Sequence, residues 1–83
     1  MVDDRVIRAA LLELAVARAP TPFCPSEVAR ALAAEWRPLM PDVRRVAAEL
    51  ADEGQMVATQ KGAPVNAVAA RWPIRLALKP DEG

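Results

Sequence analysis

The chain has 83 residues, so we expect one domain with a thin hydrophobic core. It contains no histidine and a single cysteine, which excludes a histidine-based catalytic pair, histidine-ligated metals and an internal disulfide. Eleven basic and eleven acidic residues cancel, which weighs against a strongly basic nucleic-acid-binding protein. The charges are unevenly distributed, however, because residues 37–79 carry an excess of three positive charges.

The N-terminal residues lack the positive charge of a signal peptide, since Asp3 and Asp4 follow Met1 and Val2. No apolar run reaches the ~18 residues that a membrane span requires. We therefore predict a cytoplasmic protein that does not contact a membrane. A single domain is expected over residues 1–83, with its core at about 4–78 and a flexible tail over 79–83.

The first predicted helix starts after Asp3, which can cap it, and ends before Pro20. Apolar residues recur along it at helical spacing and make one stripe: Val6, Ile7, Ala10, Leu11 and Leu14. Leu12 and Val16 widen this stripe. Either this helix is deeply packed, or part of it meets a protein partner.

Two further helices are predicted over residues 25–35 and 41–53, joined by a turn at 36–40. Pro25 and Pro41 suit first helical positions, and Gly54 suits the left-handed residue that ends a helix. In the third helix the buried positions are expected at Val43, Val46, Ala47 and Leu50. Trp36, in the turn, is interpreted as a plug between helices rather than a stacking platform.

Alternating apolar residues predict strands over 55–60 and 72–78, with a loop at 63–71 between them. Residues 21–24 could supply one more edge strand, since prolines keep them extended. The order of elements indicates an α+β, mostly α, winged helix-turn-helix. It would have three helices and a two- or three-stranded β-wing.

Several segments resemble a small family of bacterial winged-helix domains, DUF3253. The resemblance covers about residues 5–78 and is carried by residues 25–30, 36–40, 43–44, 59–62 and 73–76. Trp72 stands where the family pattern has a glycine. The resemblance implies a winged-helix fold of unassigned biochemical function.

The predicted nucleic-acid contacts lie on the third helix, the turn and the wing. Arg44 and Arg45 occupy the start of the helix that reads DNA in helix-turn-helix proteins, where guanidinium groups can bind phosphate or guanine. Arg37, Gln60 and Lys61 complete the set. An alternative for Arg45 is a solvated helix face with a weak i,i+4 pair to Glu49.

The sequence predicts a nucleic-acid-binding, transcription-regulator-like module that contacts duplex DNA. The alternative is a protein–protein adaptor that uses Leu12 and Val16 of the first helix, because winged helices also serve that purpose. We expect neither enzymatic activity nor a cofactor. Cys24 is expected to be a small buried residue, and Arg75 to pair with a carboxylate on the second helix rather than join Lys61 in a basic wing.

Overall fold

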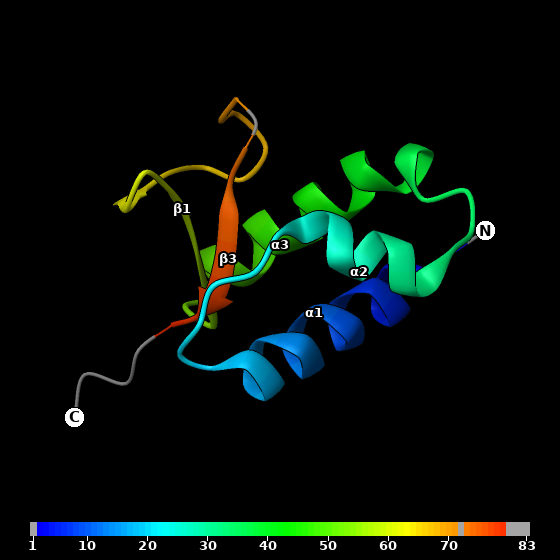
Figure 1. Cartoon of the computed structure of the whole chain (residues 1–83), viewed down its shortest axis with the longest axis horizontal. Coiled ribbons are helices and arrows are strands. Elements are labelled where there is room, and N and C mark those ends of the chain that lie inside the picture. The colour runs from blue at the N-terminus through cyan, green and yellow to red at the C-terminus, as the bar shows by residue number, and fades with distance from the viewer. Residues whose placement is uncertain (1, 72, 80–83) are drawn as a thin grey trace.

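A computed structural model describes residues 2–71 and 73–79, and shows helices packed beside a small antiparallel sheet (Figure 1). The helices are α1 (Asp4–Arg18), α2 (Pro25–Leu32), the short 3-10 helix η1 (Arg37–Leu39) and α3 (Met40–Asp52). The strands are β1 (Met56–Gln60), β2 (Ala63–Pro64) and β3 (Arg75–Leu78). The predicted α+β winged-helix architecture is confirmed.

The helix ends are made largely by the residues expected to make them. Oδ1 of Asp3 accepts a 2.8 Å hydrogen bond from the backbone N–H of Arg5, which caps α1. Gly54 has a φ of +79°, and Gln55 N–H donates to the carbonyl of Leu50 at 3.0 Å, which closes the end of α3. These contacts satisfy backbone groups that a helix end would otherwise leave exposed.

The second helix is shorter than predicted. It ends at Leu32, whereas the prediction extended it to residue 35. Ala33 is extended, with φ −153° and ψ 142°, although its N–H still donates to Ala29. The chain then folds back so that the Trp36 indole lies over the Arg30 guanidinium. The turn itself contains η1, which leads directly into α3 at Met40.

The sheet has the order β2-β1-β3. β1 and β3 pair from Met56–Leu78 to Thr59–Arg75, and a tight turn at Lys61 and Gly62 joins β1 to β2. Strand β2 falls inside the segment predicted to be a loop. The expected edge segment is confirmed in part, because Phe23 forms an isolated bridge with Leu76.

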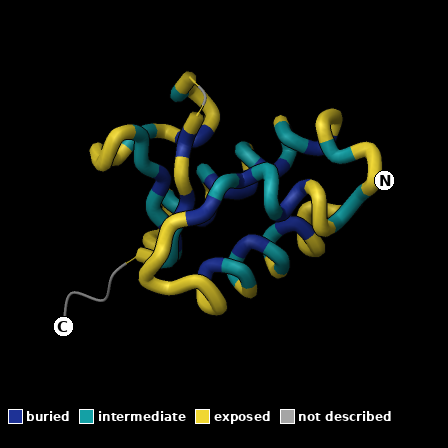
Figure 2. Tube along the Cα trace, in the orientation of Figure 1, coloured by how far each residue is buried: buried dark blue, intermediate teal, exposed yellow. Residues whose placement is uncertain are grey.

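The core lies where the three helices meet one face of the sheet, as the central buried segments in Figure 2 show. The predicted buried positions of α3 are confirmed, and Leu50 has no exposed surface. In α1 the buried residues are Ile7, Leu11 and Ala15, at i, i+4 and i+8. Val6 was expected on the apolar stripe but is 49% exposed, because this narrow line is the part of α1 that faces the core.

None of the helices that the structure describes combines the length and the apolar character needed to cross a membrane. The expectations for Trp72 and for residues 80–83 of the tail lie outside the described residues.

Candidate nucleic-acid interface

The outward face of α3 carries Arg45 among three carboxylates. Its guanidinium donates to Asp4 at 2.8 and 2.9 Å, to Glu49 at 3.2 Å and to Asp42 at 3.3 Å. The hydrogen bond from Arg45 lowers the pKa of Asp4, and the same bond raises the pKa of Arg45. The alternative of an Arg45–Glu49 pair is confirmed. This face is net negative, which disfavours phosphate there.

Arg44, on the neighbouring side of α3, is hydrogen-bonded to the loop that follows β2. Its Nε donates to the carbonyl of Ala67 at 2.8 Å, and its Nη2 donates to the carbonyls of Val68, at 3.2 Å, and of Ala70. We call residues 65–71 the wing loop. Arg44 therefore positions this loop against α3, and its predicted contact with DNA stays a prediction.

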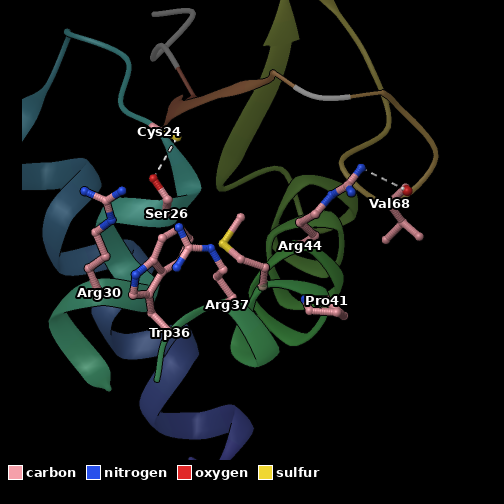
Figure 3. A pocket seen from close by; sticks show the side chains of 9 residues that line it. Cys24, Ser26, Arg30, Trp36, Arg37, Pro41, Arg44 and Val68 are labelled. Atoms are coloured by element: carbon pink, nitrogen blue, oxygen red, sulfur yellow. Dashed lines mark hydrogen bonds between the residues drawn. The ribbon is translucent and has the colours of Figure 1, made fainter. Parts of the chain in front are cut away.

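A hollow lies between α2, η1, the start of α3 and the wing loop (Figure 3). We call it the helix hollow, and its volume is about 580 Å³. Its described lining includes three arginines and no carboxylate. The lining residues are Cys24, Ser26, Arg30, Trp36, Arg37, Met40, Pro41, Arg44 and Val68.

Two of these arginines stack on the ring of Trp36. The guanidinium carbons of Arg30 and Arg37 each lie 4.5 Å from the centroid of the indole ring, which is a cation–π distance. The indole is half-buried and packs against the core, so the expected plug is present. The same ring also carries the two stacked guanidinium groups, so Trp36 is both a plug and a surface for stacking. Arg37, a predicted contact, thus lies in the helix hollow.

A second hollow of about 610 Å³ lies along the wing, and we call it the wing hollow. It brings together the predicted contacts Gln60 and Lys61 with two further basic residues. Nε2 of Gln60 donates to the carbonyls of Arg71 and, at 3.2 Å, of Pro73, which ties the two arms of the wing together. Its described lining contains no carboxylate: Thr59, Gln60, Lys61, Arg71, Pro73 and Arg75.

The favoured pairing of Arg75 with a carboxylate on the second helix does not form as a contact ion pair among the described residues. Glu27, the acidic residue of α2, binds Arg18 of α1 at 2.5 Å instead. The pKa of Glu27 is lowered mainly by its hydrogen bond from Arg18, and the more distant charge of Arg75 adds to that effect. Arg75 donates a weak 3.4 Å hydrogen bond to the carbonyl of Ile74 and forms no ion pair with the residues that the structure describes. Arg75 and Lys61 line the same hollow, which is the arrangement that the basic-wing alternative expects.

Cys24 is half-buried and lines the helix hollow, so it is less enclosed than predicted. Its Sγ lies 3.0 Å from the hydroxyl oxygen of Ser26. Its backbone N–H donates to Oε2 of Glu27 at 3.1 Å, which helps to cap α2. Cys24 thus has a structural part at the helix start.

Three residues of these hollows were missed or misjudged from sequence: Arg30, Arg71 and Trp36. Arg30 was expected to point outward, and it is exposed, but the early end of α2 brings the Trp36 ring over it. Arg71 had no periodic signal because it lies in an irregular loop. One available signal was that Arg30 and Arg37 lie close in sequence to Trp36, on either side of it.

Three helices followed by a small antiparallel sheet, with basic hollows beside the third helix and the wing, define a winged-helix domain. Residues 4–79 match the family model described as "Protein of unknown function (DUF3253)", and the chain belongs to this family. The resemblance stated from the sequence is thereby confirmed. A search of curated proteins finds no match.

Proposed function

We propose that this domain binds nucleic acid through one continuous surface made of the helix hollow and the wing hollow. The observation that carries the proposal is the charge of their linings. In a chain of net charge zero, six basic residues and no described acidic residue line the two hollows. The phosphate backbone of nucleic acid is the partner that such a surface attracts. A cytoplasmic location, where nucleic acid is accessible, belongs to the same proposal.

The wing connects the two hollows. Val68 of the wing loop lines the helix hollow, while Arg71 and Arg75, a few residues further on, line the wing hollow. Arg44 supports this continuity by holding the loop carbonyls against α3. A backbone that follows the wing would therefore meet positive charge along both hollows.

Two ion pairs join α1 to α3 and to the residue that caps its C-terminal end, which supports the same assignment. Asp4 of α1 binds Arg45 at 2.8 Å, and Arg8 of α1 binds Glu53 at 2.8 Å through Nη1. These pairs keep negative charge on the side of α3 away from the helix hollow. Nucleic acid is then expected to approach through Arg37, Lys61 and Gln60 more than through Arg45.

The test is fluorescence anisotropy with a random-sequence duplex between about 50 and about 200 mM salt. Neutralising about three to five phosphates predicts a log–log slope of roughly −2.7 to −4.5, at about −0.9 per phosphate. Arg37→Gln and Lys61→Gln should each weaken binding and flatten the slope by about 0.9. Absence of binding at low salt would overturn the proposal.

Two matched variants control for the loss of charge alone. Arg5→Gln removes one positive charge from α1, at a residue whose side chain is 90% exposed. Arg45→Gln removes one from the outward face of α3. Both should bind almost as the unmodified chain does. Equal weakening by Arg5→Gln and Arg37→Gln would mean that net charge, and not the hollows, determines binding.

The alternative function, a protein adaptor, is favoured by the exposed part of α1. Val16 is 64% exposed and Val6 is 49% exposed, whereas Leu12 is half-buried against the core and offers less surface than expected. A photo-crosslinking residue at position 16, compared with one at position 5, tests this alternative in expressing cells. Crosslinks from position 16 alone, together with no duplex binding, would favour the adaptor.

A further inference from the structure

We infer that the helix hollow is a binding site for a mononucleotide, with Arg30 and Arg37 as the residues that hold its phosphate. This inference goes beyond the proposed function, because a free nucleotide can occupy the hollow whether or not the wing binds a strand. Its basis is the way in which the two guanidinium groups are held.

Four arginines of the described residues are positioned by carboxylates: Arg5, Arg8, Arg18 and Arg45. Such a pair consumes N–H donors and cancels the charge. The guanidinium groups of Arg30 and Arg37 instead lie over the Trp36 ring at 4.5 Å, and no hydrogen bond or ion pair joins either guanidinium to another residue that the structure describes. The indole leaves both the charge and the in-plane N–H donors available.

This arrangement is suited to phosphate. A guanidinium presents a planar fork of N–H donors that matches phosphate oxygens bidentately. Two such groups fixed by one ring lose less side-chain freedom on binding than two unrestrained arginines would. Because both residues also line the helix hollow, Arg30 and Arg37 offer preorganised donors to an anion that enters it.

The rest of the hollow is suited to a flat apolar group. Met40, Pro41 and Val68 contribute apolar surface, and Val68 is 56% exposed. Figure 3 shows Arg30, Trp36 and Arg37 gathered on one side of the hollow, with Arg44 and Val68 on the other. The volume of about 580 Å³ falls within the range typical of small-molecule sites. A phosphate on one side leaves room for a nucleobase against the apolar residues.

The first measurement is a titration of the full ¹⁵N-labelled chain by two-dimensional NMR with adenosine monophosphate. Adenosine and inorganic phosphate are titrated separately as controls, because each contains only one part of the nucleotide. We expect the monophosphate to shift the signals of Trp36, Arg37 and Val68, and each half to bind at least about tenfold more weakly. Equal shifts with adenosine, or none with the monophosphate at millimolar concentration, would overturn the inference.

Variants separate a site from general electrostatic attraction. Arg30→Gln and Arg37→Gln should each raise the Kd for adenosine monophosphate about tenfold, the loss expected for a hydrogen bond to a charged group. Arg5→Gln, with the same change in charge, should leave the Kd unchanged. A similar loss in all three variants would contradict the inference.

Trp36 provides a test in which charge does not change. Trp36→Leu should raise the Kd for adenosine monophosphate although both arginines remain, and Trp36→Phe, which keeps a ring, should restore much of the affinity. Thermal melting of each variant verifies that the domain is folded. Unchanged affinity in a folded Trp36→Leu variant would show that the ring does not position the arginines.

The same phosphate and base could come from a free nucleotide or from the end of a strand. A short single strand with a 5′-phosphate, compared with its 5′-hydroxyl counterpart, distinguishes the two sources. Displacement of adenosine monophosphate by the phosphorylated strand alone assigns the hollow to strand ends, and displacement by neither assigns it to free nucleotides. If the monophosphate binds and the duplex does not, the proposed function fails while this inference stands.

Discussion

The Nε of Arg44 on α3 donates a 2.8 Å hydrogen bond to the carbonyl of Ala67, 23 residues further along the chain. Ala67 is only 1% exposed, so this bond fixes the point at which the wing loop enters the core. A residue placed on the third helix by sequence thus controls the position of the wing. Helix and wing are consequently held as one surface.

Arg44→Lys is expected to loosen the wing loop while keeping the positive charge. Lysine has no planar fork to bond the carbonyls of Ala67, Val68 and Ala70 together. Losing these hydrogen bonds should lower the free energy of unfolding by about 1–3 kcal/mol. It should also accelerate amide hydrogen exchange in the wing loop, which NMR measures. Arg45→Lys is the matched control. Equal exchange rates in the two variants would mean that the loop does not depend on Arg44.

Leu50→Ala is expected to destabilise the domain by about 2–5 kcal/mol, because the deleted atoms leave a cavity in the core. Leu50 has no exposed surface at the junction of α3 and the sheet. Denaturant unfolding measures the change. Val16→Ala, at a residue 64% exposed, is the control and should change stability by less than about 0.5 kcal/mol. Similar losses in both variants would contradict the packing.

The stability of the domain should fall in acid. Ion pairs with arginines lower the pKa of Asp4 below 3.8, and those of Glu27 and Glu53 below 4.5. Each carboxylate therefore contributes stability that is present above its ordinary pKa and is lost as the pH falls through its lower folded value. Denaturant unfolding at successive pH values below 4.5 measures this loss.

Glu53→Gln provides the control for the acid effect. It removes the 2.8 Å pair with Arg8 and should make the fall in stability below pH 4.5 shallower. High salt should reduce the same contribution, since these pairs are exposed. A fall of unchanged steepness in the variant would assign the acid sensitivity to other groups.

Gly62→Ala is expected to destabilise the hairpin between β1 and β2 by about 1–2 kcal/mol. Gly62 has a φ of +82°, and no atom lies within 4 Å of an added Cβ, so the backbone conformation alone produces the cost. Lys61 precedes it with a φ of 53°. Lys61→Asn should therefore stabilise the domain by up to about 1 kcal/mol, since asparagine tolerates this conformation. Thermal melting measures both variants. The melting temperature should fall for Gly62→Ala and rise for Lys61→Asn, and a change in the same direction for both would contradict this account of the turn.

Much of the fold follows from local patterns. The apolar spacing of α3 and the glycine at position 54 are sufficient to place that helix and its end, and alternation places β1. The end of α2 was missed because residues 33–35 are good helix formers. The contacts that Trp36 makes after this end, with the core and with Arg30, are tertiary and leave no local pattern in the sequence. Strand β2 was missed because a strand of two residues is too short to show an alternation of apolar and polar residues.

The candidate site was harder to predict than the fold. Sequence placed Arg44 and Arg45 on the third helix, but their partners lie far away in the chain: Arg45 binds Asp4 at a separation of 41 residues, and Arg44 binds Ala67 at a separation of 23. The spacing of residues within one helix cannot predict contacts with residues so far away in the chain. The hollows arise where α2, η1 and the wing meet, and their charge became visible only in three dimensions.

The bridge between Phe23 and Leu76 affects how the sheet meets other molecules. Both residues donate to one another's carbonyls at 2.8 Å, so the outer side of β3 is already hydrogen-bonded at Leu76. On the opposite side β2 has only two residues and ends in Pro64, which cannot donate a backbone hydrogen bond. A strand from a second molecule thus finds little backbone to pair with on either side. The wing can present an open, charged surface without offering a template for edge-to-edge aggregation.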